Sequence, residues 1–159
     1  MKEGKVFKYG DNVNTDVIIP ARYLNDASAE NLRAHVLEDL DHTFAKRVRE
    51  GDFVVGGFNF GSGSSREHAP LALKAAGVSA VIAKSFARIF FRNAVNIGLL
   101  LIENAKMADE ISENDVLTLE NDKLTDLTTG AVYTLAPMDD YVKRIMEKGG
   151  LMEALKDEG

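Results

Sequence analysis

The chain has 159 residues, a length that suits one domain, residues 1–159, with a substantial apolar core. Its net charge of −6 argues against a nucleic-acid partner, since nucleic-acid-binding domains usually present a basic face. It has no cysteine, so it forms no disulfide and supplies no thiolate to an iron–sulfur cluster. Its three histidines are too scattered to predict a zinc site, and we expect no metal ligands.

The N-terminal sequence and the apolar runs indicate where in the cell the protein is expected. A charged start at residues 1–5 is followed by no signal-peptide pattern. The longest strongly apolar stretch, residues 97–102, is too short to span a bilayer. We therefore expect a cytoplasmic protein that does not enter the membrane.

The first predicted elements are short. Residues 5–9 alternate charged and apolar side chains, which indicates a half-buried strand. After a polar turn, the apolar residues 17–19 predict a buried strand ended by Pro20. Ser28 is placed to cap a helix over residues 29–37, and a second helical stretch follows with Phe44 and Val48 four residues apart.

The middle of the chain alternates strands and helices. Strands are predicted at residues 53–55, 78–83 and 99–102. The intervening helices span residues 71–76, ended by Gly77, and residues 86–95. This β-α-β-α-β order predicts parallel strands joined by right-handed crossovers.

The C-terminal part has a different sequence pattern. Residues 116–119 and 131–134 flank turn signals and predict antiparallel strands, and residues 139–156 predict an amphipathic helix interrupted by two glycines. Together the elements predict a mixed α/β domain, a barrel built from β/β/α layers.

One glycine- and serine-rich stretch, residues 61–68 (GSGSSREH), carries the candidate chemistry. Pro70 has no N–H and fits only a first helical turn, so the following helix is expected to begin near Arg66 or Glu67. Ser64 and Ser65 would then lie at the positive end of that helix, where unpaired N–H groups bind carboxylates or phosphates and stabilise an alkoxide. Arg66 adds a planar donor pair for a carboxylate.

The stretch matches no common nucleotide or nucleophile motif. Arg66 stands where a dinucleotide fingerprint needs its third glycine, no Gly-Lys-Ser/Thr follows for a P-loop, and no G-x-S-x-G elbow is present. On the residues alone, an anion site and an ordinary capped helix with a glycine-rich approach are equally good hypotheses.

Three blocks resemble a known family. Residues 63–69 (GSSREHA) resemble the signature of the swivelling domain of the aconitase superfamily. Residues 84–89 (KSFARI), with Asn93 and residues 98–99, resemble its next block. Residues 14–18 (NTDVI) and 20–24 (PARYL) resemble the opening of the free-standing small subunits of split, isopropylmalate isomerase-type enzymes. The blocks occur in the family's order and extend to about residue 101.

The resemblance implies the superfamily's three-layer β/β/α swivelling-domain barrel and a hydro-lyase that dehydrates and rehydrates a small hydroxy-diacid. It implies that a separate large subunit carries the [4Fe–4S] cluster, in a heterodimer or heterotetramer, and that this chain binds no cofactor itself. The lack of cysteine agrees with that division. An isolated chain would also expose its partner surface, so we expect it to be able to self-associate.

The same resemblance assigns roles by position. Ser64 matches the serine base, Ser65 a neighbouring substrate-binding serine, and Arg66 a carboxylate-binding arginine. Asp16 matches an aspartate close to the serine loop, expected to orient Arg66 or a loop hydroxyl. Simple N-capping by Ser65 and a local turn role for Asp16 remain alternatives.

Residues flanking these positions have simpler expected roles. Glu67 suits a helix N-terminal charge and His68 a packed side chain. Lys84 and Arg88 suit the loop, the partner interface or a solvated surface. The aromatic and aliphatic residues of the same block are expected in the core or at an interface: Phe86, Ile89, Phe90 and Phe91.

The segment that the resemblance associates with substrate choice comprises Tyr23, Leu24, Asn25 and Asp26. Relatives that act on homoaconitate tend to place an arginine here, whereas this chain has none and Asp26 would repel a third carboxylate. The resemblance therefore favours interconversion of 2-isopropylmalate and 3-isopropylmalate in leucine biosynthesis. Alternatives are a related hydro-lyase for 2,3-dimethylmalate, citraconate or citramalate, or homoaconitate, a non-catalytic anion-binding module, or a structural protein with the same fold.

Overall fold

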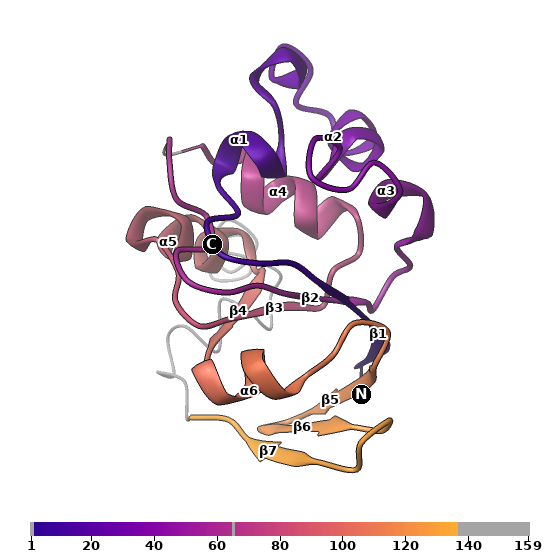
Figure 1. Cartoon of the computed structure of the whole chain (residues 1–159). Coiled ribbons are helices and arrows are strands. Elements are labelled where there is room, and N and C mark those ends of the chain that lie inside the picture. The colour runs from indigo at the N-terminus through magenta and orange to yellow at the C-terminus, as the bar shows by residue number, and fades with distance from the viewer. Residues whose placement is uncertain (1, 65, 137–159) are drawn as a thin grey trace, which may run out of the picture.

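Seven strands form one sheet in the order β4-β3-β2-β1-β5-β6-β7 (Figure 1). The computed structural model describes residues 2–64 and 66–136. Pairing is parallel from β1 to β4 and antiparallel from β1 through β5 and β6 to β7. The strands are β1 (Lys2–Lys8), β2 (Phe53–Val55), β3 (Ala80–Ala83), β4 (Leu100–Glu103), β5 (Val116–Glu120), β6 (Lys123–Asp126) and β7 (Val132–Thr134).

Strand β1 joins the two halves of the sheet. Its first part, residues 2–5, pairs with β5, and its second part, residues 6–8, pairs with β2. At this crossing Gly4 lies so close to another segment that a Cβ would be 2.1 Å from the Gly51 carbonyl oxygen. Glycine is therefore required where the sheet turns from one half to the other.

The helices divide between the two faces of the parallel half. Alternate side chains of the strands separate the layers: Val54 and Val81 face the cluster that contains most helices, whereas Val55 and Ile82 face the cluster with α6, β5 and β6. Figure 1 shows α6 between the parallel strands and the antiparallel strands. The helical elements are α1 (Thr15–Ile18), the 3-10 turn η1 (Ala21–Tyr23), α2 (Ala29–His35), α3 (Phe44–Arg47), α4 (His68–Ala75), α5 (Arg88–Ile97) and α6 (Ala105–Glu110).

This arrangement confirms the three-layer β/β/α prediction and the parallel middle of the sheet. The cap at Ser28 is also confirmed, since its Oγ accepts the Asn31 N–H at 3.2 Å. Within the described residues, no helix has the length and apolarity needed to cross a membrane. The helix predicted over residues 139–156 lies outside the described residues.

One local prediction was wrong, and two elements were missed. Residues 17–19 belong mostly to α1, because the Asn14 side chain accepts the Val17 N–H and starts a helical turn; a short buried apolar run does not distinguish strand from helix. Helix α6 and strand β6 were not predicted. The signal for α6 was Asn104, whose side chain accepts the Met107 N–H.

A buried carboxyl pair lies in the antiparallel half. Asp126 is 1% exposed and Asp115 is 5% exposed. Burial and the Asp115 carboxyl beside it raise the pKa of Asp126 above its ordinary value of 3.8. Asp126 Oδ1 accepts the Thr128 and Thr129 N–H groups, while Oδ2 has no donor among the described side chains. A proton shared between the two carboxyl groups would satisfy that atom.

We expect Asp126→Asn to stabilise the chain at pH 7 by roughly 1 kcal/mol, because the amide N–H₂ can donate to Asp115. A raised carboxyl pKa costs stability above the folded value, and this cost disappears as the pH falls toward 3.8. The difference between variant and wild type should therefore shrink on acidification. Urea unfolding of both proteins from pH 7 to pH 4.5 measures it, and an equal difference at every pH would contradict the shared-proton explanation.

Candidate active site

The serine loop, residues 56–64, leads from β2 toward α4 and is fixed by backbone from the N-terminal region. The Gly61 N–H donates to the Val13 carbonyl at 2.7 Å. The Thr15 N–H donates to the Ser62 carbonyl at 2.8 Å. These bonds hold the loop against the start of α1, so two segments about fifty residues apart in the sequence form one site.

The base of the loop packs on aromatic side chains near α5. The Phe60 N–H donates to the Ser85 carbonyl at 3.0 Å, and the Phe60 ring centroid lies 5.9 Å from that of Phe86 and 5.6 Å from that of Phe90. Gly61 has φ +85°, and a Cβ on it would lie 2.1 Å from Phe90 Cγ. Position 61 therefore needs glycine for both conformation and space.

Gly61→Ala is expected to lower the free energy of unfolding by about 2–5 kcal/mol, through backbone strain and a clash with Phe90. Gly130→Ala is the matched control, because Gly130 has φ +84° but open space around it. It should cost only the backbone strain, about 1–2 kcal/mol. Denaturant unfolding of both variants gives the comparison, and equal losses would show that the Phe90 contact is unimportant.

Asp16 and Arg66 form an ion pair beside Ser64. Asp16 Oδ1 contacts Arg66 Nη1, and the Arg66 side chain is 22% exposed whereas that of Asp16 is 63% exposed. Nη1 itself is buried and makes no well-aligned hydrogen bond within the described residues, so the contact is chiefly electrostatic. Ser64 is exposed, and its carbonyl accepts the Arg66 N–H at 2.9 Å. The structure thus brings Asp16, Ser64 and Arg66 together.

Helix α4 begins before the apolar run at residues 71–76, but later than the start near Arg66 or Glu67 that Pro70 predicts. Its first residue is His68 and its N-cap is Glu67, whose side chain makes no capping hydrogen bond. Ser64 therefore lies three residues before the N-cap, where the helix dipole acts more weakly. Ser65, predicted to bind substrate or cap the helix, lies outside the described residues.

Thr15 lies beside the loop and was not among the site residues predicted from the sequence. It is 2% exposed, and its Oγ1 atom has no hydrogen-bond partner within the described part of the chain. A Cβ on Gly63 would lie 3.2 Å from that atom, so the hydroxyl sits directly beside the loop. The position of Thr15 one residue after the Asn14 cap could have indicated it.

The predicted specificity segment forms a tight turn. The Asn31 side-chain amide donates to the carbonyls of Tyr23 and Asp26, at 3.1 and 2.7 Å. The Tyr23 ring stacks on His35 at 3.8 Å. The Ser28 N–H donates to Asp26 Oδ1 at 3.0 Å, and this bond lowers the Asp26 pKa.

This turn packs on the helix-side core rather than pairing with the serine loop. Leu24 and Tyr23 are half-buried against the helix-side core, whereas Asn25 is exposed. We find no hydrogen bond or ion pair between described residues of segments 23–26 and 61–66. The described residues thus show no polar link between the two parts of the predicted site.

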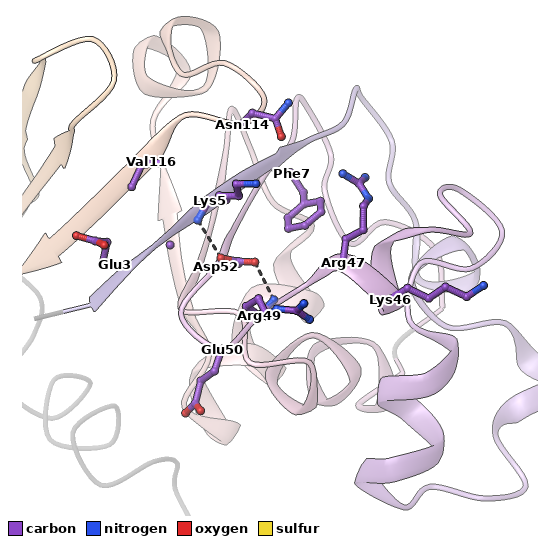
Figure 2. A pocket seen from close by; sticks show the side chains of 11 residues that line it. Glu3, Lys5, Phe7, Lys46, Arg47, Arg49, Glu50, Asp52, Asn114 and Val116 are labelled. Carbon is purple, nitrogen blue, oxygen red and sulfur yellow. Dashed lines mark hydrogen bonds between the residues drawn. The ribbon is translucent and has the colours of Figure 1, made fainter.

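A hollow of about 590 Å³ lies elsewhere, between β1, the segment after α3 and the approach to β5 (Figure 2). Buried Asp52 forms its floor and accepts the N–H groups of Lys5 and Arg49 at 2.9 and 2.8 Å. Asp52 therefore ties β1 to the turn before β2. Among the residues that the structure describes, no group of three or more His, Asp or Glu is placed to hold a metal ion.

The fold and the loop define a class of protein: a mixed α/β domain with a serine-arginine loop between a parallel strand and a helix. The family model for the aconitase C-terminal domain matches residues 26–107. Small subunits of 3-isopropylmalate dehydratase from Ruminiclostridium cellulolyticum and Caldanaerobacter subterraneus subsp. tengcongensis are 52% and 49% identical, each over 98% of this chain, covering 96% and 98% of those proteins.

A crystal structure of 3-isopropylmalate dehydratase from Methanocaldococcus jannaschii superposes with a TM-score of 0.90 at 40% identity, covering 98% of this chain and 93% of that one. The chain therefore belongs to the family of 3-isopropylmalate dehydratase small subunits, which are hydro-lyase subunits. This confirms the resemblance in the sequence and its fold class. The roles of the individual loop residues stay predictions.

Proposed function

We propose that this chain is the small subunit of a cytoplasmic two-chain hydro-lyase that interconverts 2-isopropylmalate and 3-isopropylmalate, a step of leucine biosynthesis. Near-complete coverage of relatives that bear the small-subunit name supports the assignment. The observation that carries the local chemistry is the Asp16–Arg66 ion pair beside exposed Ser64.

The reaction removes a proton from one carbon and a hydroxyl from its neighbour, then adds water with the hydroxyl on the other carbon. In the proposal, Ser64 Oγ takes the proton in dehydration and returns it in rehydration. The Arg66 guanidinium binds a substrate carboxylate, and Asp16 holds that guanidinium in place. Ser65 provides a further hydrogen bond to the substrate.

The second chain is needed because this one has no cysteine with which to bind a cluster. A [4Fe–4S] cluster on the large subunit would supply a Lewis acid for the substrate hydroxyl. Within this chain, the exposed face of Ser64 suits a site that closes only when the partner covers it. The isolated chain should therefore be inactive.

The proposed substrate has a neutral variable group. The Tyr23–Asp26 turn carries a negative charge at Asp26, whose pKa is lowered, and no cation to receive a third carboxylate. Arg22, just before it, already pairs with Asp39 at 2.6 Å. A carboxylate at this position would be repelled.

Reconstitution with the large subunit of the same organism tests this proposal. The kcat/KM values of the pair should be highest for 2-isopropylmalate and lower for 2,3-dimethylmalate, citraconate and homoaconitate. A higher value for one of the other three would reassign the substrate. A pair that binds these diacids but converts none would favour a non-catalytic anion-binding module.

A further inference from the structure

The outward face of the first turns of α5 is unusually apolar for a surface helix. Ile89 is 52% exposed and Phe91 is 40% exposed, while Phe90 and Ala94 form the buried face. Solvent-facing positions of a helix normally carry polar side chains. We call Phe86, Arg88, Ile89, Phe91 and Arg92 the α5 face.

The α5 face is continuous with the base of the serine loop. The Phe86 ring centroid lies 5.9 Å from that of Phe60 and 6.0 Å from that of Phe91, so the rings connect the loop to the helix surface. The Phe90 ring beneath this face abuts Gly61. Figure 1 shows α5 on the same side of the molecule as the chain between β2 and α4. A large partner that covers Ser64 would therefore extend over α5.

The charge of this face differs from that of the whole chain. Arg88 and Arg92 form no ion pair among the described residues, although the chain carries a net charge of −6. The nearby Glu103 carboxylate accepts the Phe86 N–H at 3.1 Å. A hollow of about 400 Å³ lies between these aromatic and charged side chains. The face fits an apolar side chain flanked by a carboxylate.

We propose that the α5 face is the docking surface for the large subunit and that it receives an apolar side chain with an acidic neighbour. Aromatic and arginine side chains of this kind are enriched where interfaces derive their affinity. The inference rests on the proposed function, since that function requires a second chain over Ser64. Beyond that function, the inference identifies the part of this chain that binds the large subunit.

The test measures the Kd between the full-length chain and the cluster-bearing large subunit of the same organism. Ile89→Asp and Phe91→Asp should each raise this Kd by at least about tenfold, because a charge is then buried in the interface. Val132→Asp is the matched control, because Val132 is 60% exposed on β7, in the antiparallel half of the sheet. It should change the Kd by less than about threefold.

Circular dichroism melting shows whether each variant is folded, and Ile89→Ala and Phe91→Ala replace any aspartate variant that is not. Arg88→Glu should also raise the Kd with the large subunit. The change of this Kd with salt concentration should have the opposite sign to that of the wild type. Wild-type affinity in folded Ile89 and Phe91 variants would overturn the proposal. So would a variant that abolishes self-association of the isolated chain and leaves the Kd with the large subunit unchanged.

Ser64→Ala separates this inference from the proposed function. It should assemble with wild-type Kd and lose most of its activity. If it assembles and is fully active while the α5 variants fail to assemble, the serine-base assignment fails and the docking surface stands. If the α5 variants assemble normally while Ser64→Ala is inactive, the docking surface fails and the function stands.

Discussion

Replacing Ser64 with alanine is expected to reduce the kcat of the reconstituted pair by about 10²–10⁴-fold, the usual contribution of a positioned general base. Ser64 is exposed, so removing its hydroxyl leaves no buried group unsatisfied and should not change the stability of the chain. Steady-state kinetics with 2-isopropylmalate, together with a melting curve, measure both effects.

Ser62→Ala is the control for this prediction. Ser62 lies in the same loop and contributes its backbone carbonyl, which accepts the Thr15 N–H, and alanine preserves that bond. The variant should keep activity within about threefold of wild type. Full activity of Ser64→Ala, or an equal loss in both variants, would contradict the assignment of Ser64 as the base.

Replacing Arg66 with alanine is expected to lower kcat/KM by about 10²–10³-fold, since it removes a charged partner from a substrate carboxylate. Lysine should restore little of the loss, because an ammonium cannot present two parallel donors. Asp16→Asn should have a smaller effect of the same kind, because it loosens the guanidinium without removing it. Initial rates over a range of substrate concentrations separate KM from kcat.

Arg47→Ala provides the comparison for Arg66. It breaks another arginine–aspartate pair, Arg47 Nη2 with Asp41 Oδ2 at 3.3 Å, on a different part of the molecule. It should affect stability slightly and leave kcat/KM unchanged. If Arg66→Ala keeps a wild-type KM for 2-isopropylmalate, Arg66 does not bind the substrate carboxylate.

Much of the fold could be predicted because local and long-range signals agree. The apolar run at residues 53–55 is buried on both faces of the sheet, as expected for a central parallel strand. The apolar run at residues 17–19 is equally short, but there the Asn14 cap and packing against α4 produce a helix. Burial can be read from such a run, whereas its conformation depends on neighbours far along the chain.

The candidate site could be predicted less well from the properties of its residues alone. Glycine, serine and arginine between a strand and a helix predict an anion site or a cap with equal weight, and only the resemblance linked Asp16 to the loop. The structure explains that link by the Thr15–Ser62 backbone hydrogen bond and the Asp16–Arg66 pair. No local pattern could show a contact between segments fifty residues apart.

For the α5 face, the sequence predicted the kind of environment but not which residues are buried. The aromatic and aliphatic residues of this block were expected in the core or at an interface, and the structure divides them: Phe90 is buried, whereas Ile89 and Phe91 are exposed. Helical periodicity could have suggested this division once the helix start was known. The helix begins at Arg88 rather than Phe86, so Phe86 precedes the helix and its side chain does not follow the helical period.

The most direct test of the shared active site is a titration of a fixed amount of cluster-bearing large subunit with this chain, following 3-isopropylmalate formed from 2-isopropylmalate. The account predicts no activity from either chain alone and a rate that rises with added chain to a plateau. Ser64→Ala should displace the wild-type chain and lower that plateau. A large subunit that is equally active without this chain would contradict the account.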